Sequence, residues 1–331
     1  MSLTPSKVSA GSTGEAADDL DVVVESIEDV AACVKALTLR PVTGAALPAW
    51  QPGSHIDVFL PSGAVRQYSL CGDRHDSDAW RIAVLREPAG KGRGGSEYIH
   101  TSLRTGTKIR VGAPRDNFAL VESQRYLFIA GGIGITPILP MITHVHEQGA
   151  TWRLVYGGRT ADSMAFRDEL ERYGDRVEFW PEDRAGLIDL ARVLTETPTD
   201  TAIYSCGPTA LLEALEEHCR DRPAGALHTE RFVPKADART ATDAAFEVVL
   251  AKQDRTITIP PDKSILHTLE AAGVEVLSSC QQGMCGRCEQ TVLEGRPDHR
   301  DEVLTPEERE SNEYILICVS RCLGERLVLD L

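Results

Sequence analysis

Residues 280–290, CQQGMCGRCEQ, contain three of the nine cysteines in this chain of 331 residues. Four residues separate Cys280 from Cys285, two separate Cys285 from Cys288, and Cys318 follows in ILICVSRC. This spacing is typical of the four thiolates that hold a plant-type [2Fe–2S] cluster. The sequence therefore predicts these four cysteines as the ligands of such a cluster.

Two other interpretations of these cysteines are a zinc site and a set of free buried thiols. Zinc sites usually pair one CxxC motif with a second one or with histidines, whereas this sequence has a single CxxC. Gly283 and Gly286 lie between the first three ligands, where a backbone without Cβ atoms can turn tightly and approach a cluster. Cys322 is expected to be a spare thiol, because the fourth ligand is already supplied by Cys318.

Composition and charge narrow the class of protein. With 42% hydrophobic and 26% charged residues, the chain has the composition of a globular protein with room for two or three domains. Its net charge of −15 argues against nucleic acid and anionic membranes as partners, since both are bound through Lys and Arg. Residues 245–331 contain nine Lys and Arg against sixteen Asp and Glu, so this acidic end suits a basic partner.

The sequence predicts no secretory signal and no membrane segment. Residues 1–20 lack an apolar core and are interpreted as a disordered leader. Residues 126–143 are uncharged, yet their glycines and prolines fit a strand, a turn and a helix better than a membrane span. The cysteines lack a regular disulfide-like spacing, which favours a reducing compartment, so the protein is expected in the cytoplasm.

The pattern of apolar residues divides the chain into three folded segments. Residues 21–122 contain six β-branched runs separated by turn residues, which is typical of an antiparallel β-barrel. Residues 123–232 alternate apolar runs with helical stretches, which predicts an α/β domain whose parallel sheet is covered on both faces. Residues 233–244 are interpreted as a linker, and residues 245–331 combine a hairpin, a helix, the cysteine loop and three further strands.

The α/β segment contains two candidate phosphate-binding turns. AGGIGITP at residues 130–137 follows an expected strand and opens a helix, with Thr136 as candidate N-cap and Pro137 in the first turn. YSCGP at residues 204–208 is a second strand end at a helix start, and both belong at the carboxyl edge of a parallel sheet. Together they predict a dinucleotide crevice, although a tight strand-to-helix turn alone would explain the first. The candidate residues are Gly131, Gly132, Gly134, Thr136, Cys206, Gly207 and Pro208.

Two short motifs of the first segment suit a flavin. In RQYSL, Arg66 can pair with a phosphate, Tyr68 can stack on the flavin ring, and Ser69 can hydrogen-bond a ring nitrogen. KGRGGS at residues 91–96 is a cationic, glycine-rich loop that can wrap a terminal phosphate. Taken singly, the first motif also fits an amphipathic strand and the second a hairpin tip.

The ordered set of motifs resembles the phthalate dioxygenase reductase and vanillate O-demethylase reductase family. The resemblance runs from about residue 21 to 331 and is carried by RQYSL, GRGGS, GGIGITP, CGP, CQQGMCGRC, PDHRDEVLT and CVSR. It implies an FMN-binding β-barrel, an NAD-binding α/β domain and a C-terminal α+β ferredoxin domain of the β-grasp type. The flavin-binding residues that it implies are Arg66, Tyr68, Ser69, Val84, Leu85, Arg86, Gly94, Gly95, Ser96, Thr136 and Phe232.

Two residues depart from the family pattern. Gln281 stands where many relatives carry Glu, and Leu85 stands where some have a basic residue. The first change bears on the potential of the cluster and the second weakens phosphate binding at that position. FAD, which more distant relatives use, is the alternative to FMN.

The implied function is electron transfer to a separate protein. A nicotinamide delivers two electrons as a hydride, a [2Fe–2S] cluster accepts one at a time, and a flavin connects the two. The resemblance implies NADH as donor, although Arg159 lies where an adenosine 2′-phosphate of NADPH would approach. No acid–base residue is required. Cys206 is interpreted as orienting the nicotinamide or as structural, and His55 as structural.

The acceptor implied by the resemblance is an oxygenase component, of the Rieske-type aromatic dioxygenase or O-demethylase class. A cytochrome P450 is the nearest alternative, since related reductase modules serve both. Two further hypotheses are a redox sensor whose cluster controls binding to a regulator, and a flavin diaphorase with a vestigial cluster. The sequence has no DNA-binding motif that supports the sensor.

Overall fold

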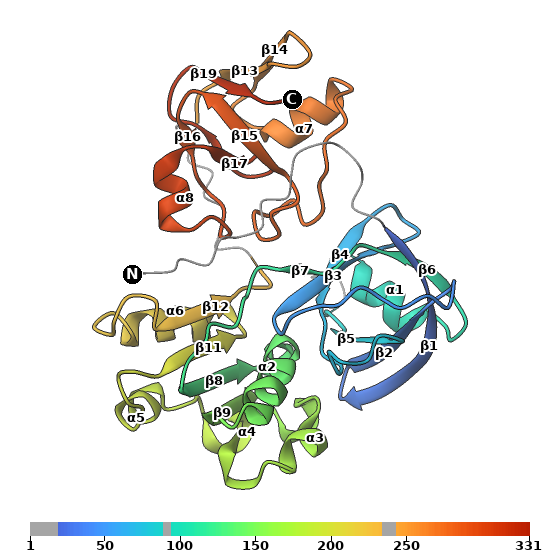
Figure 1. Cartoon of the computed structure of the whole chain (residues 1–331), viewed down its shortest axis with the longest axis vertical. Helices are drawn as coiled ribbons and strands as arrows, with labels where there is room; N and C mark the ends of the chain where they lie inside the picture. The colour runs from blue at the N-terminus through green and yellow to red at the C-terminus, as the bar shows by residue number, and fades with distance from the viewer. Residues whose placement is uncertain (1–18, 89–93, 234–242) are drawn as a thin grey trace.

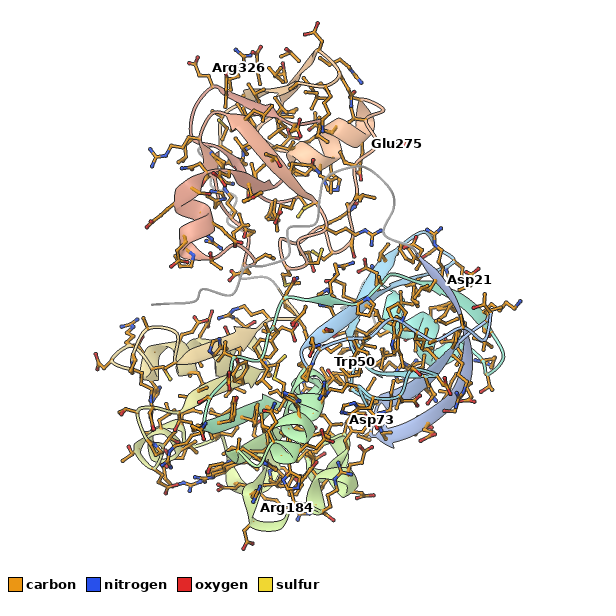
Figure 2. The ribbon with its side chains drawn as sticks, in the orientation of Figure 1. Asp21, Trp50, Asp73, Arg184, Glu275 and Arg326 are labelled. Carbon is orange, nitrogen blue, oxygen red and sulfur yellow. The ribbon has the colours of Figure 1, made fainter. Side chains whose placement is uncertain are left out.

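The computed structural model describes residues 19–88, 94–233 and 243–331, which form three main sheets and one small two-stranded sheet. Figure 1 shows the first sheet at the right in blue, the second at the lower left in green and yellow, and the third at the top in orange and red. Nearly all of the expected leader and linker lie outside the described residues, as do residues 91–93 of the glycine-rich loop. Arg184 and Arg326 mark opposite ends of the molecule (Figure 2).

The first sheet is antiparallel throughout, as predicted. Its path runs β4-β3-β6-β1-β2-β5, with β7 paired to β3. The helix α1 (Gly95–Thr101), which the sequence did not predict, follows β5. The strands are β1 (Leu20–Ala31), β2 (Val34–Pro41), β3 (Ser54–Phe59), β4 (Val65–Ser69), β5 (Trp80–Leu85), β6 (Lys108–Val111) and β7 (Arg115–Asp116).

The predicted barrel is not closed by a continuous ladder in the described residues. The end strands β4 and β5 meet through one isolated bridge between Leu70 and Ile82 and a hydrogen bond from Cys71 N to Arg81 O. Beyond this point a cavity opens between the two strands, lined by residues of both, and it occupies the place where the ladder would continue. The closed barrel is therefore replaced by a sheet that curls round a binding space.

Alternation along the strands builds the core of the first sheet. Val22 and Val24 on β1, and Leu37 and Leu39 on β2, are fully buried because residues two apart share a face of a strand. Trp80 joins them at 1% exposure. This core holds β3 and β4 in place on the side of the sheet that faces the cavity.

The second sheet is wholly parallel, with the order β10-β9-β8-β11-β12. Its strands are β8 (Arg125–Gly131), β9 (Thr151–Gly158), β10 (Val177–Pro181), β11 (Ala202–Cys206) and β12 (Leu227–Glu230). The α-helices are α2 (Ile135–Glu147), α3 (Arg167–Glu171), α4 (Glu182–Ala185), α5 (Leu190–Thr195) and α6 (Thr209–His218). Single 3₁₀ turns are η1 (Gly132–Gly134), η2 (Ala161–Ser163) and η3 (Gly174–Arg176).

Helices cover both faces of this sheet, which confirms the prediction. Tyr126 and Phe128 of β8 pack in one core cluster with α2, whereas Leu127 and Ile129 pack in another with α5 and α6. Such alternation to opposite faces follows from the two-residue period of a strand. The carboxyl ends of β8 and β11, where the glycine turns lie, are left at one edge.

The third sheet has the order β14-β13-β19-β15-β17 and only its β13–β19 pair is parallel. Together with α7 it makes the expected α+β fold. Its main elements are β13 (Phe246–Leu250), β14 (Arg255–Ile259), α7 (Ile265–Ala271), β15 (Glu289–Glu294), β17 (Tyr314–Leu316) and β19 (Arg326–Leu329). The small sheet pairs β16 (Pro297–Asp298) with β18 (Arg321–Cys322), and α8 (Pro306–Ser311) precedes β17.

The first and second parts are packed into one body. Ala36 and Ala83 of the first sheet share a core cluster with Ile135 of α2. The Arg81 guanidinium donates to both carboxylate oxygens of Glu169, at 2.7 and 3.0 Å. None of the helices in the described part of the chain is long and apolar enough to cross a membrane.

Candidate functional site

The four predicted ligand cysteines come together in the third part of the molecule. Cys280, Cys285 and Cys288 lie on the loop between α7 and β15, and Cys318 follows β17. All four are buried, with exposed fractions of 4, 2, 2 and 6%. The thiol of Cys280 lies within hydrogen-bonding reach of those of Cys285 and Cys318, and Cys318 reaches Cys288 in turn.

Backbone N–H groups of the loop point at the sulfurs. Gln282 N and Met284 N donate to Cys280 Sγ at 3.3 and 3.4 Å, and Gly283 N donates to Cys318 Sγ at 3.3 Å. Gly283 has φ +71°, and a Cβ there would lie 2.6 Å from Val319 Cγ2. Only glycine fits this turn without displacing its neighbour, because of both the left-handed backbone and the close approach.

The donor set fits a two-iron cluster. Four buried thiols with backbone N–H groups aimed at them are the ligands and the hydrogen bonds that a [2Fe–2S] centre uses. Within the described residues, no group of three or more His, Cys, Asp or Glu side chains is arranged to hold a single metal ion.

A cavity of about 440 Å³ opens where the three parts of the molecule meet. Eight of the eleven flavin residues implied by the sequence line it. They come from β4, β5, the start of α1, the start of α2 and the segment after β12: Arg66, Tyr68, Ser69, Leu85, Gly95, Ser96, Thr136 and Phe232. Ser69 Oγ is buried and has no hydrogen-bond partner in the described structure, so the cavity offers a polar ligand an unused hydroxyl.

Three residues of the same prediction do not line the cavity. Val84 is buried in the core of the first sheet, at 1% exposure. Arg86 pairs with Glu97 at 2.9 Å, and Gly94 is the N-cap of α1 with φ +80°. These residues support the cavity wall behind Leu85 and Ser96.

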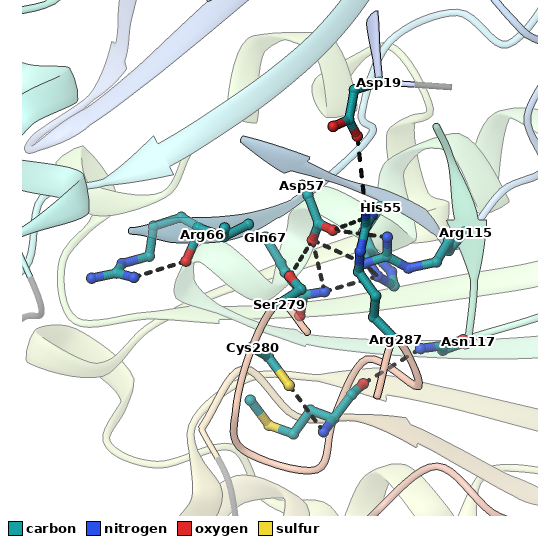
Figure 3. A network of polar contacts seen from close by, with 12 residues as sticks. Asp19, His55, Asp57, Arg66, Gln67, Arg115, Asn117, Ser279, Cys280 and Arg287 are labelled. Atoms are coloured by element: carbon teal, nitrogen blue, oxygen red, sulfur yellow. Dashed lines mark hydrogen bonds and ion pairs between the residues drawn. The ribbon is translucent and has the colours of Figure 1, made fainter. Parts of the chain in front are cut away.

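The cysteine loop forms the opposite wall of this cavity. Cys280, Gln282 and Met284 line it together with the residues of β4. Asn117 Nδ2 donates to Met284 O at 3.4 Å across the boundary between the parts (Figure 3). A predicted cluster ligand, Cys280, therefore borders the space that the predicted flavin residues line.

The predicted nucleotide turns meet at the carboxyl edge of the parallel sheet. A Cβ on Gly134 would lie 2.2 Å from Cys206 O, and one on Gly131 would lie 2.5 Å from Pro208 Cδ. Gly207 also lies against Gly131. These contacts leave no room for side chains, so the ends of β8 and β11 and the start of α6 form one continuous surface.

The structure corrects one detail of the nucleotide prediction, the residue that caps α2. Thr136 is not the N-cap of α2, because the helix already begins at Ile135 with Gly134 as its N-cap. Instead Thr136 Oγ1 donates to Ile133 O at 3.0 Å and the residue lines the cavity. Arg159 is exposed after the end of β9 and does not line the cavity.

A carboxyl group that the sequence reasoning missed lies beside Cys206. Glu230 ends β12, next to Cys206 in register, and lines the cavity near Thr136. The pKa of Glu230 is raised to about 8, first by burial and then by the nearby charge of Asp116, while the hydrogen bond with the Cys206 thiol opposes the shift. Burial also raises the pKa of Cys206 well above its usual value, so this thiol is not a nucleophile at neutral pH.

Two buried polar residues lie on β3: His55, which the sequence analysis interprets as structural, and Asp57, which it missed. His55 and Asp57 alternate on one face of that strand and are buried at 5 and 0% exposure. Burial and then the charge of Arg115 lower the pKa of His55 to about 4, so its ring is neutral at pH 7. Two polar residues at alternate positions of an otherwise apolar strand were the available signal.

Two protein-family models match separate parts of the chain. Residues 248–323 match the 2Fe-2S iron-sulfur cluster binding domain, and residues 128–217 match the oxidoreductase NAD-binding domain. The tetrachlorobenzoquinone reductase of Sphingobium chlorophenolicum is 40% identical over 94% of this chain and 98% of that protein. The phenoxybenzoate dioxygenase subunit beta of Ectopseudomonas oleovorans is 42% identical over 88% of this chain and 91% of its own.

Two solved structures are similar over almost the whole chain. An intact type IV self-sufficient cytochrome P450 monooxygenase has a TM-score of 0.89 and 38% identity, and the match covers 98% of this chain and 43% of the longer one. Phthalate dioxygenase reductase has a TM-score of 0.69 and 33% identity, covering 95% of this chain and 98% of that one. With the thiol set and the cavity they establish that the chain belongs to the phthalate dioxygenase reductase family of iron–sulfur flavoprotein oxidoreductases.

Proposed function

We propose that this protein is the reductase component of an oxygenase system, passing electrons from NADH through FMN and a [2Fe–2S] cluster to a separate oxygenase. One observation carries the proposal: a single cavity is lined by β4, by Thr136 beside the nucleotide turn and by the cluster ligand Cys280. A bound flavin would accept a hydride from the nicotinamide and release electrons singly to the cluster.

The side chains around the cavity divide the work of binding. We assign Arg66 to the flavin phosphate, Tyr68 to the ring face and Ser69 to a ring nitrogen. We assign Gly95 and Ser96, at the start of α1, to the same phosphate, and the turns at Gly134 and Gly207 to the nucleotide pyrophosphate. The domain limits 21–122, 123–232 and 245–331 belong to the same proposal.

The acceptor is inferred from the relatives. The 42% identical relative is named as a subunit of a dioxygenase, and phthalate dioxygenase reductase is named for the oxygenase that it reduces. We therefore place a Rieske-type oxygenase or O-demethylase first. A cytochrome P450 is the second candidate, because the P450 structure contains a module that is similar over 98% of this chain.

The decisive experiment is an anaerobic titration of the purified protein with NADH, followed by visible absorbance and low-temperature EPR. Flavin bleaching together with the EPR signal of a reduced thiolate-ligated cluster is the expected result. Flavin bleaching without a cluster signal, even after dithionite is added, would indicate that the protein is a flavin diaphorase with a vestigial cluster. Acid release and chromatography of the flavin distinguish FMN from FAD.

Replacement of a ligand separates the two electron carriers. In Cys285→Ser we expect NADH-driven ferricyanide reduction to persist and cytochrome c reduction to disappear, because only the second passes through the cluster. Equal loss of both activities would contradict this order of transfer. A kcat/KM ratio for NADH over NADPH below one would overturn the choice of donor.

A further inference from the structure

Asp57 is a fully buried carboxylate at the boundary between the first sheet and the cysteine loop. It lies on β3, at 0% exposure, and Arg115 of β7 donates to both of its oxygens at 2.8 Å. Gln67 of β4 donates to Oδ1 at 3.1 Å. Figure 3 shows these side chains converging on Asp57 from neighbouring strands. The first sheet alone therefore neutralises this carboxylate.

Two more partners reach Asp57 from the third part of the chain. Ser279 Oγ donates to Oδ1 at 2.5 Å, and Arg287 Nη1 lies 3.2 Å from Oδ2. Ser279 directly precedes the ligand Cys280, and Arg287 directly precedes the ligand Cys288. One carboxylate thus holds the cysteine loop at both ends, across 222 and 230 residues of sequence.

The third part adds a second guanidinium, that of Arg287, to the charges around Asp57. Arg287 is 11% exposed, and its other amino group lies 3.8 Å from Asp19, which precedes β1. Arg287 thereby lies between two carboxylates, Asp57 and Asp19, each of which also pairs with an arginine of the first sheet: Arg115 with Asp57, and Arg110 with Asp19 at 3.4 Å. His55 lies beside Arg115 and stays neutral at pH 7. A buried charge without its partner is costly, so this arrangement fixes one docked orientation.

We propose that Asp57 is a positioning residue that holds the cysteine loop, and Cys280 with it, against the flavin cavity, and so sets the rate of electron transfer between the two carriers. The inference rests on the proposed function. The proposal gives Asp57, on β3, a role in electron transfer that is separate from the binding of the flavin or of the cluster. Asp57 touches neither a cluster ligand nor the cavity; it acts through Ser279 and Arg287.

The competing explanation is that Asp57 only stabilises the first sheet through Arg115. The two explanations differ at Ser279, which lies outside that sheet and whose hydroxyl donates to Asp57. If the network holds the cysteine loop in place, removal of the Ser279 hydroxyl weakens the network from the side of that loop. If the network serves the sheet alone, the same change has no effect on transfer.

The test uses the full-length protein loaded with both cofactors, in the variants Asp57→Asn and Ser279→Ala and in the double variant. Asp29→Asn is the matched control: it removes a carboxylate from the same sheet, but Asp29 is 76% exposed and pairs with Lys35. Rapid mixing with NADH follows flavin bleaching, and freeze-quench EPR follows reduction of the cluster. Amide hydrogen exchange of residues 279–288 reports docking without any turnover.

We expect Asp57→Asn to slow cluster reduction at least about tenfold, since small displacements of redox or reacting partners are costly, while flavin bleaching stays at the wild-type rate. Ser279→Ala should act in the same direction with a smaller effect. The double variant should be no slower than Asp57→Asn, because the two single changes act on the same contact, the one between Ser279 and Asp57. Exchange in residues 279–288 should accelerate in these variants and not in Asp29→Asn.

The proposal would be overturned if both single variants reduced the cluster at the wild-type rate and exchanged the amide hydrogens of residues 279–288 at the wild-type rate. Equal slowing of flavin bleaching and cluster reduction would do the same, because it would indicate a general loss of the first sheet. If Asp57→Asn fails to fold, Ser279→Ala alone decides by the same two readouts. If the wild-type cluster is not reduced by NADH at all, the proposed function fails, and hydrogen exchange still tests the docking.

Discussion

Ser69 has a buried hydroxyl without a hydrogen-bond partner in the described structure, on the wall of the cavity. Natural proteins rarely leave such a group unsatisfied unless a ligand completes it. We therefore expect Ser69→Ala to weaken flavin binding about tenfold, the equivalent of one hydrogen bond of about 1.4 kcal/mol. Fluorescence titration of the deflavinated protein measures this. Ser26→Ala, which removes a hydroxyl bonded to Thr38 on β1 and β2, should bind flavin normally.

Glu230 gives the molecule a pH dependence of stability near neutrality. Its pKa is raised to about 8 in the folded protein, above the ordinary value of 4.5, so unfolding releases a proton between these values. Stability contributed by the protonated carboxyl is thus complete at low pH and is lost as pH rises through about 8. We expect the melting temperature of the wild type, relative to Glu230→Gln, to fall between pH 5 and pH 8. If the melting temperatures of the wild type and of Glu230→Gln changed with pH in the same way, the raised pKa of Glu230 would be contradicted.

At the residue scale, the sequence predicted the four candidate cluster ligands, but it did not predict the buried polar residues near them. The spacing of Cys280, Cys285, Cys288 and Cys318 specifies a loop whose thiols converge, and the structure brings them together. Asp57 and Glu230 escaped because their roles come from neighbours more than 20 residues away in sequence, such as Ser279 and Cys206. No local spacing reports such a contact.

Among the elements, the turn between β8 and α2 has no room for a side chain at Gly134. A Cβ on Gly134 would lie 2.2 Å from the carbonyl oxygen of Cys206, which is backbone and cannot rotate aside. We expect Gly134→Ala to cost on the order of 1–3 kcal/mol of stability, as overpacking typically does, and to raise the KM for NADH. Gly324→Ala is the control, since a Cβ there meets only Cys322 Sγ at 3.9 Å. Equal melting temperatures for the two variants would contradict the clash.

The strands could be predicted from their runs of β-branched residues, because alternation of burial is local to each strand. Three short helices, α1, α4 and α8, were overlooked, and the reasons differ between α8 and α1. The start of α8 carried a readable signal, Thr305 and Glu308 in a capping box with Pro306 in the first turn. In contrast, α1 starts at Gly94 without any side-chain cap. Closure of the first sheet depends on how far β4 and β5 diverge, which is a tertiary property.

At the scale of the whole molecule, Arg81 joins the first sheet to the second part. It donates to Glu169 and to Cys71 O, and its guanidinium lies 4.7 Å above the Phe166 ring. Arg81→Met keeps the stem but leaves the Cys71 carbonyl oxygen without this donor, at a cost of about 1–3 kcal/mol. We expect calorimetry to show a broader unfolding transition as the two parts uncouple. Arg40→Met, which breaks an exposed pair with Glu25, should leave the transition unchanged.

The division into three parts could be predicted from changes in periodicity along the chain, but their mutual packing could not. The sequence places the cysteine loop and RQYSL more than 200 residues apart, and only the fold makes Cys280 and Ser69 face one cavity. That arrangement depends on polar contacts such as Asn117 with Met284, whose residue types are common on any surface.

The contacts of Asp57 also bear on the order in which the chain is made. Ser279 and Arg287 are synthesised more than 200 residues after Asp57, so neither exists when β3 leaves the ribosome. Arg115 follows Asp57 after only 58 residues and can neutralise it in the meantime. The first sheet therefore has the contacts to fold during translation, and the cluster-bearing part, with its own core, is added last to a finished body.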